Sequence, residues 1–435
     1  MYAYYFQLGL RSLRRNPMLT ALMVMAIGFG VAASMTTYSV FRATARNPIP
    51  QKSSQLFIPQ IDNWGPEDTE DGEPPVALTY KDAVALWRAH KAPRQTTIYP
   101  VAAAIVPDDA SRLPMREDAY AVTGDFFPMF EVPFVYGRGW TAEEDEKHAS
   151  VVVISRAVND KVFNGADSTG KQINIDDHLY RIVGVTEDWN PSPRFYDLPN
   201  TGGFDDAAGL YMPFSRAIDL QKLTNGNNNC NSDPGDGWDN YIRSECVWIG
   251  LWVELPTKAD ATAYRQYLDG YTAEQKSAGR FRWANNTRLR NVTEWLDSQH
   301  VVPAESQISL LVSLGFLAIC LVNTIGLLLA KFMKRAPEIG VRRALGASRK
   351  EIYLQFLLEA ATVGLAGGVL GLALTGLGVL GVGLIFEPQI AELAHLDIEL
   401  VLLTLLVAVG ATILAAFYPT WRAAQVQPAW QLKSN

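Results

Sequence analysis

Four apolar segments, each long enough to cross a lipid bilayer, constrain this chain more than any other feature. A helix needs about 20 apolar residues to span a hydrocarbon core of about 30 Å. The sequence predicts four such spans, at residues 17–42, 306–330, 352–386 and 398–420. The third span is too long for a simple crossing and is rich in glycine. It therefore predicts tilting, a kink or an extension past the bilayer, together with close helix packing.

For the first segment the alternative is a cleaved signal peptide, because Ala43, Thr44 and Ala45 form a small-x-small pattern. The apolar core of a signal peptide contains only about 7–15 residues, and this segment is far longer. A membrane anchor is therefore favoured. The preceding residues 1–16 mix apolar and basic side chains, which predicts a cytoplasmic amphipathic helix lying on the membrane surface in preference to a plain basic flank.

Between the first and second spans lies one polar block, residues 43–303. It holds 25 of the 38 Lys and Arg residues and 37 of the 45 Asp and Glu residues, a net charge of −12. This acidic balance argues against a nucleic-acid binder, which would show a basic face. One large polar block also excludes a carrier built from inverted membrane repeats. The predicted fold class is a membrane α-helical protein of four transmembrane helices with a large extracytoplasmic α/β domain inserted between the first and second.

The charges of the short segments predict the orientation. The loop at 331–351 carries seven Lys and Arg residues, whereas the loop at 387–397 carries three acids and neither Lys nor Arg. The positive-inside rule then places both termini, the 331–351 loop and the tail at 421–435 in the cytoplasm. The polar block and the 387–397 loop lie on the other side.

The polar block itself reads as mixed α/β. Strands are expected at 96–106, 119–123, 150–154 and 246–255, a hairpin at 170–185, and a helix at 259–278. The Pro-, Gly-, Asp- and Asn-rich segments 63–75, 189–209 and 225–240 are expected to be surface loops. The order of elements suggests that 137–245 is a subdomain inserted into a βαβ-like part formed by 43–136 and 246–303.

Of the three cysteines, Cys230 and Cys246 both fall in the polar block, whereas Cys320 lies in the second span. In an oxidising compartment a Cys230–Cys246 disulfide is favoured over two free thiols. Cys320 is expected to be a packing residue.

No catalytic or metal site is evident in the sequence. The five histidines fall at no metal-ligand spacing, and Asp233, Asp236 and Asp239 lack the partners of a calcium loop, so a solvated loop is favoured. The phosphate-loop pattern GxxxxGK[ST] does not occur in this sequence, so the chain is not expected to be an enzyme.

The most specific pattern lies in the cytoplasmic loop. Pro337 can open a short helix, Glu338 and Arg342 have i,i+4 spacing, and Gly346 permits a stop before the next helix. The segment resembles the signature of MacB/FtsX-type ABC transporter permeases, the type VII ABC fold. The residues that carry this resemblance are Pro337, Glu338, Ile339, Gly340, Val341, Arg342, Arg343, Ala344, Leu345, Gly346 and Ala347, followed by Gln355, Phe356 and Glu359. The first span, the segment 150–185 and the tail are similar to the same family.

The resemblance implies a protein subunit of the bacterial inner membrane that carries a MacB-like periplasmic core domain. The parts of that domain at 43–136 and 246–303 would be porter-like. Residues 337–347 would form a coupling helix that contacts a cytoplasmic ABC ATPase dimer. Because only sixteen residues precede the first span in this sequence, that ATPase is expected on another polypeptide. ATP and magnesium would bind there, and no cofactor is expected on this chain. The intramembrane acid Glu359 is expected to pair with a neighbouring basic group.

The resemblance further implies a second permease chain, identical or homologous, and contact with membrane lipid. It also implies mechanotransmission, in which the ATPase cycle drives movement of the periplasmic domain. The leading interpretation is export with a periplasmic adaptor and an outer-membrane channel. The alternatives are lipoprotein release and a sensory protein that activates a periplasmic partner. An anchored ectoenzyme is disfavoured because it leaves the cytoplasmic motif unexplained.

Overall fold

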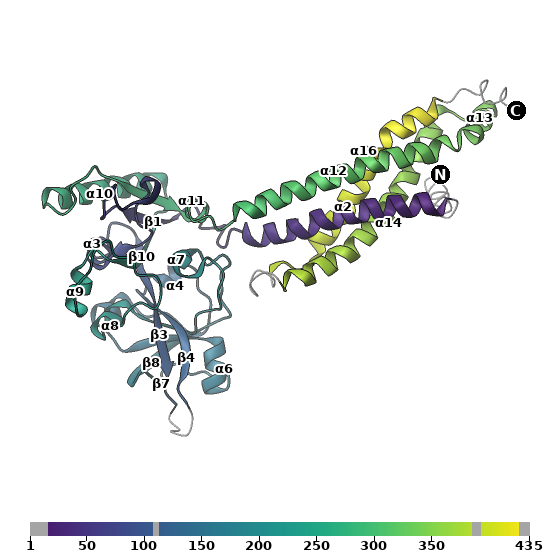
Figure 1. Cartoon of the computed structure of the whole chain (residues 1–435). Coiled ribbons are helices and arrows are strands. Elements are labelled where there is room, and N and C mark those ends of the chain that lie inside the picture. Colours follow the sequence, from purple (N-terminus) through teal and green to yellow (C-terminus); the bar gives the residue numbers. More distant parts are fainter. Residues whose placement is uncertain (1–15, 108–112, 385–392, 426–435) are drawn as a thin grey trace. The chain divides into compact units, whose positions relative to one another are not determined.

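A computed structural model describes residues 16–107, 113–384 and 393–425 of the chain (Figure 1). The chain divides into two compact units. The membrane unit comprises Met1–Ala45 and Val302–Asn435, and the outer domain comprises Arg46–Val301. The predicted helix at 1–16 lies almost wholly outside the described residues, as does most of the tail.

The membrane unit contains four helices long and apolar enough to cross a membrane and one short helix between the second and third. The long helices are α2 (Pro17–Thr44), α12 (Ala304–Met333), α14 (Arg349–Val382) and α16 (Ile398–Ala424), and the short helix is α13 (Ala336–Ala344). The predicted spans are therefore confirmed, each within a few residues. At about 1.5 Å per residue, α14 is about 50 Å long, which exceeds the hydrocarbon core.

Glycines let α2 and α14 approach closely. A Cβ atom added at Gly367 would lie 2.7 Å from the Cγ2 atom of Ile27 on α2, and one at Gly371 would lie 3.2 Å from Val31. On another side of α14, a Cβ at Gly364 would lie 2.9 Å from Thr412 of α16. The expected role of these glycines in close packing is thus confirmed, whereas no atom of the described residues lies within 4 Å of a Cβ added at Gly381.

The outer domain is built on an eleven-stranded mixed sheet. Its strands are β1 (Leu56–Ile61), β2 (Leu78–Thr79), β3 (Arg94–Ile105), β4 (Met115–Val122), β5 (Phe134–Gly137), β6 (Val151–Ser155), β7 (Gln172–Ile175), β8 (His178–Thr186), β9 (Leu210–Pro213), β10 (Val247–Glu254) and β11 (Thr287–Asn291). The order is β11-β1-β10-β3-β4-β9-β6-β8-β5, with β2 paired to β10 and β7 paired to β3 and β8. The pairs β4–β9 and β6–β8 are parallel.

Helices and helical turns connect the strands. They are η1 (Glu70–Gly72), α3 (Tyr80–Arg88), α4 (Phe126–Met129), α5 (Ala142–Glu146), α6 (Arg156–Phe163), η2 (Phe195–Asp197), α7 (Leu198–Thr201), α8 (Phe214–Asp219), α9 (Trp238–Arg243), α10 (Lys258–Ser277) and α11 (Val292–Ser298). Side chains of the N-cap residues hold several of these helices at their first turn. Thr257, for example, forms a capping box with Asp260 at the start of α10.

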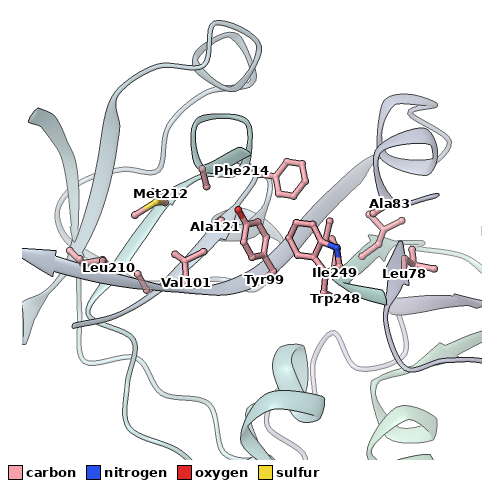
Figure 2. Packing of buried hydrophobic residues seen from close by; sticks show 14 of the residues in the cluster. Leu78, Ala83, Tyr99, Val101, Ala121, Leu210, Met212, Phe214, Trp248 and Ile249 are labelled. Atoms are coloured by element: carbon pink, nitrogen blue, oxygen red, sulfur yellow. The ribbon is translucent and has the colours of Figure 1, made fainter. Parts of the chain in front are cut away.

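The core of the outer domain gathers around the central strands β3, β4 and β10 (Figure 2). Tyr99 on β3 lies edge-to-face against Trp248 on β10, with ring centroids 4.8 Å apart, and against Phe214 at 5.8 Å. Val101 and Ala121 continue this core along β3 and β4. Aromatic burial of this kind contributes both apolar area and ring geometry to stability.

The predicted strands and helix are confirmed, including the hairpin, in which Asp176 and Asp177 both have positive φ as a type I′ turn requires. The surface-loop prediction for 189–209 is wrong in its centre. Phe195 and Tyr196 are buried there, and Trp295 donates a hydrogen bond to the carbonyl of Phe195 (3.1 Å). Composition pointed to a loop because polar residues flank this short aromatic segment.

Beyond β4 the sheet continues with β9, β6 and β8, which come from 137–245, but its last strand is β5 (Phe134–Gly137), which comes almost wholly from the preceding part of the chain. The sheet nevertheless runs without a break from β11 to β5, and the outer domain is one compact unit. A separate inserted subdomain therefore stays a prediction.

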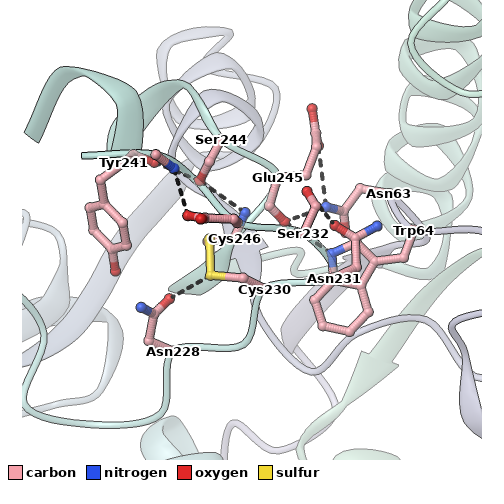
Figure 3. The surroundings of a disulfide bond; sticks show 12 residues. Asn63, Trp64, Asn228, Cys230, Asn231, Ser232, Tyr241, Ser244, Glu245 and Cys246 are labelled. Carbon is pink, nitrogen blue, oxygen red and sulfur yellow. Dashed lines mark hydrogen bonds between the residues drawn. A yellow bond between two sulfur atoms is a disulfide. The ribbon is translucent and has the colours of Figure 1, made fainter. Parts of the chain in front are cut away.

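Cys230 and Cys246 are joined by a disulfide that closes the loop before β10 (Figure 3). Antiparallel hydrogen bonds between Asn229 and Val247 hold the same loop base. On the other side of Cys246, the carbonyl of Glu245 accepts hydrogen bonds from Asn63 and from the indole of Trp64, both at 2.9 Å. Two segments far apart in sequence thus meet beside the disulfide.

We expect G367A to destabilise the membrane unit, because the added methyl group collides with Ile27 and drives α2 and α14 apart. The control is G381A in the same helix, which has open space and gains helix propensity of about 1 kcal/mol. Thermal unfolding of the purified protein should show a lower midpoint for G367A alone. Equal midpoints for the two variants would contradict the packing described.

We expect replacement of both Cys230 and Cys246 by serine to lower the free energy of unfolding by about 2–4 kcal/mol, since the cross-link restricts the unfolded chain. Reductant should lower the unfolding midpoint of the unaltered protein and leave that of the double variant unchanged. A midpoint insensitive to both treatments would show that the disulfide contributes nothing.

Candidate coupling site

The candidate site is the turn of chain from the end of α12 to the start of α14, with α13 between them. Pro337 is among the first residues of α13, where its missing N–H costs nothing. At the other end, Ala347 N–H donates to the carbonyl of Arg342 (3.0 Å) and Gly346 N–H to that of Arg343 (3.2 Å). This is a Schellman motif, and Gly346 supplies the positive φ (101°) it needs.

Ser348 then begins α14 in a capping box with Glu351. The loop between α13 and α14 is therefore only a few residues long, and both of its ends are fixed by hydrogen bonds. As a result, α13 cannot rotate freely relative to α14.

One face of α13 packs into the membrane unit. Ala336, Ile339 and Gly340 are buried on this face, and Ile339 belongs to the same core as Ile352 and Phe356 of α14. Phe356 also packs against Phe332 at the end of α12, with ring centroids 4.4 Å apart.

A buried carboxylate ties α12 to α14 beside this core. Glu359 on α14 is 3% exposed, and its oxygens lie 3.0 Å from Nζ of Lys331 and 2.7 Å from Nη1 of Arg335. The side chain of Lys331 is completely buried. A charge removed from water in this way is retained only when it is closely paired. The buried charge of Glu359 is therefore stable only beside that of Lys331, and the reverse also holds.

The ion pairs continue onto α13. Arg335 also contacts Glu338 (3.3 Å), and Glu338 pairs with Arg342 (2.7 Å) at the predicted i,i+4 spacing. Arg342 in turn donates to the side-chain oxygen of Gln355 on α14 (3.0 Å). Charges from α12, α13 and α14 thus form one chain of contacts.

Two apolar side chains are exposed on the outward side of α13, one within the helix and one at its C-cap. Val341 is 53% exposed and Leu345 is 83% exposed. Pro337, Arg342 and Ala344 are exposed on the same helix, and Ala347 follows half-buried. Adjacent exposed apolar side chains on a rigid helix are typical of a docking surface.

The comparisons with known proteins agree with this architecture. Residues 20–271 match the family model of the MacB-like periplasmic core domain, and residues 310–428 match that of the FtsX-like permease C-terminal domain. The chain belongs to the MacB/FtsX-like ABC transporter permeases.

Curated relatives of this permease are longer. The macrolide export ATP-binding/permease protein MacB of Azoarcus sp. (strain BH72) is 24% identical over 432 residues, covering 98% of this chain and 59% of that protein. The MacB protein of Escherichia coli (strain K12) is 23% identical over 369 residues, covering 84% of this chain and 51% of that protein. The permease thus spans about half the length of the curated relatives it matches.

Among solved structures, the periplasmic region of MacB from Actinobacillus actinomycetemcomitans is 15% identical, covers 56% of this chain and 92% of that one, and gives a TM-score of 0.36. Together with the four apolar helices, the periplasmic-type domain of the family match indicates an inner-membrane protein.

The structure brings the predicted coupling residues into one short helix with its two ends, and places Glu359 beside them. Sequence reasoning expected a basic partner for Glu359 without identifying it. The partners are Lys331 and Arg335, which were counted only as positive-inside charges. Their i,i+4 spacing at the end of an apolar helix was the available signal. Within the described residues, no cluster of His, Cys, Asp and Glu could hold a metal ion.

We expect E359Q to lower the free energy of unfolding by about 3–5 kcal/mol, because it leaves Lys331 buried without its counter-charge. The double variant K331M/E359Q removes both charges and should recover most of this loss. Chemical unfolding in mixed micelles measures the difference. If the double variant is less stable than E359Q, the two side chains are not coupled as described.

Proposed function

We propose that this permease is the membrane subunit of an ATP-driven transporter of the mechanotransmission type, and that α13 is its coupling helix. One observation carries the proposal. Val341 and Leu345 are exposed on one face of α13, while its opposite face and its Glu338–Arg342 pair are fixed to α12 and α14. A partner that moved this helix would move both membrane helices with it.

The partner of α13 is an ABC ATPase dimer in the cytoplasm. The positive charge of the 331–351 loop supports a cytoplasmic position for α13 and for both termini. The ATPase binds ATP and magnesium. The curated relatives, whose names join ATP-binding and permease functions, support the pairing of this permease with an ATPase.

A second permease chain, identical or homologous, packs against the exposed side of α12. This side presents a stripe of apolar side chains at helical spacing, each at least 60% exposed: Ile308, Leu311, Val312, Ile319 and Val322. Lipid covers what the second chain does not. Apolar side chains that are exposed on a membrane helix are covered either by another protein helix or by lipid, because both keep them out of water.

The process driven by the transporter is export, with the outer domain in the periplasm handing its cargo to an adaptor and an outer-membrane channel. The macrolide export proteins among the relatives support this choice over lipoprotein release or signalling. In this mechanism the ATPases close on ATP, α13 moves with them, and the outer domains change their spacing.

The test is co-purification of the permease with the ATPase from membranes in mild detergent. We expect V341D/L345D to lose the ATPase, because two charges replace the apolar docking face without touching the buried face of α13. The control is L223D, which changes an equally exposed leucine in the outer domain (62% exposed).

Mass spectrometry identifies what is retained, and ATP hydrolysis by the complex gives an independent readout. Both should fall about tenfold or more for V341D/L345D, as expected when apolar anchors of an interface are replaced by charges. If V341D/L345D retains the ATPase as well as L223D does, α13 is not the docking site.

A further inference from the structure

A cavity in the outer domain lies among three short helices. It has a volume of about 350 Å³ and is lined by residues of α3, α5 and α8 and by residues next to β3 and β4. This volume falls in the range of small-molecule sites, about 300–1,000 Å³. The cavity lies entirely within the outer domain and contains none of the residues of the coupling site.

One wall of the cavity is aromatic. Phe214 on α8 stacks on Tyr80 of α3 with ring centroids 6.3 Å apart, and lies edge-on to Trp87 at 6.2 Å. Val84 and Ile218 complete the apolar surface. Tyr80 and Trp87 are only partly buried, so their rings are available to a ligand.

The cavity is also lined by many charged side chains. The cavity is lined by four carboxyl groups, one guanidinium and two imidazoles, on Asp125, Asp145, Glu146, Asp219, Arg88, His90 and His148. His148 is already engaged, because its Nδ1 lies 2.6 Å from a carboxyl oxygen of Asp219. The cavity therefore offers more negative than positive charge.

Asp145 is the most buried of these carboxyl groups, at 4% exposed. Burial raises the pKa of Asp145 to about 7, although hydrogen bonds from the backbone N–H of Gly124 (2.6 Å) and the indole of Trp140 (2.7 Å) lower it. A positive charge placed beside Asp145 would stabilise its ionised form.

A second, independent feature points to a missing donor. Gln95 lines the cavity and is 2% exposed. Its amide nitrogen donates to the carbonyl of Trp87 (2.8 Å), but its Oε1 atom has no hydrogen-bond partner among the described residues. A buried acceptor without a partner is destabilising because it has lost its hydrogen bonds to water, and a ligand N–H group would supply the missing donor.

We propose that this cavity is a binding site for an organic ammonium ion with a flat apolar body. The body would lie against the partly buried rings of Tyr80 and Trp87, which Phe214 (2% exposed) supports from within the core. The faces of such rings attract a cation as well as an apolar surface. The ammonium group would face Asp145, Glu146 and Asp219. The inference does not depend on the proposed function, because binding to the outer domain requires neither an ATPase nor a second permease.

The experiment uses the full chain in lipid nanodiscs and three probes that share one body: 1-naphthylmethylammonium, 1-naphthylmethanol and 1-naphthylacetate. Isothermal titration measures the affinity of each probe, with empty nanodiscs subtracted. We expect the ammonium to bind about tenfold more tightly than the neutral alcohol, and the carboxylate to bind most weakly.

Two variants test whether binding occurs in this cavity. E146Q/D219N removes two exposed charges that line the cavity and should sharply reduce the preference for the ammonium, leaving only what Asp145 contributes, while binding of the alcohol stays unchanged. D177N/E274Q removes two exposed acids outside the cavity and should keep the preference. W87L should weaken all three probes. The proposal would be overturned by any of three results: the three probes bind equally, the carboxylate binds most tightly, or the two charge-removing variants have equal effects.

Discussion

The pairing of Glu359 with Lys331 and Arg335 is the constraint on which the α13 end of the membrane unit depends. A carboxylate that is 3% exposed and an ammonium group on a completely buried side chain are stable there only while they hold each other. Because Lys331 belongs to α12 and Glu359 to α14, the pair fixes the separation of the two helices. The connecting α13 is consequently held in place.

The same arrangement explains why α13 suits a coupling role. Its capped C-terminal end, its buried Ile339 and its Glu338–Arg342 pair leave α13 little freedom to move independently. A helix held in this way passes on a displacement instead of absorbing it, and the close glycine contacts of α14 with α2 extend that path into the rest of the bundle. The exposed Val341 and Leu345 are the points at which a displacement could enter.

Much of the fold and the limits of the candidate site could be predicted from the sequence, because these features follow from local sequence patterns. The spans follow from length and apolarity, the hairpin from Asp176 and Asp177, and the limits of α13 from Pro337 and Gly346. What escaped prediction depends on contacts between distant segments. The burial of Phe195 and Tyr196, the partners of Glu359, and the cavity around Phe214 each need residues that only the fold brings together.

The most direct test of the central claim is site-specific photo-crosslinking from position 345 of α13 in native membranes. A photoreactive amino acid at Leu345 should attach to a polypeptide that carries an ABC ATPase, identified by mass spectrometry, whereas the same amino acid at Leu223 should not. Crosslinks from position 345 to lipid or to another protein, with no ATPase among the products, would contradict the account.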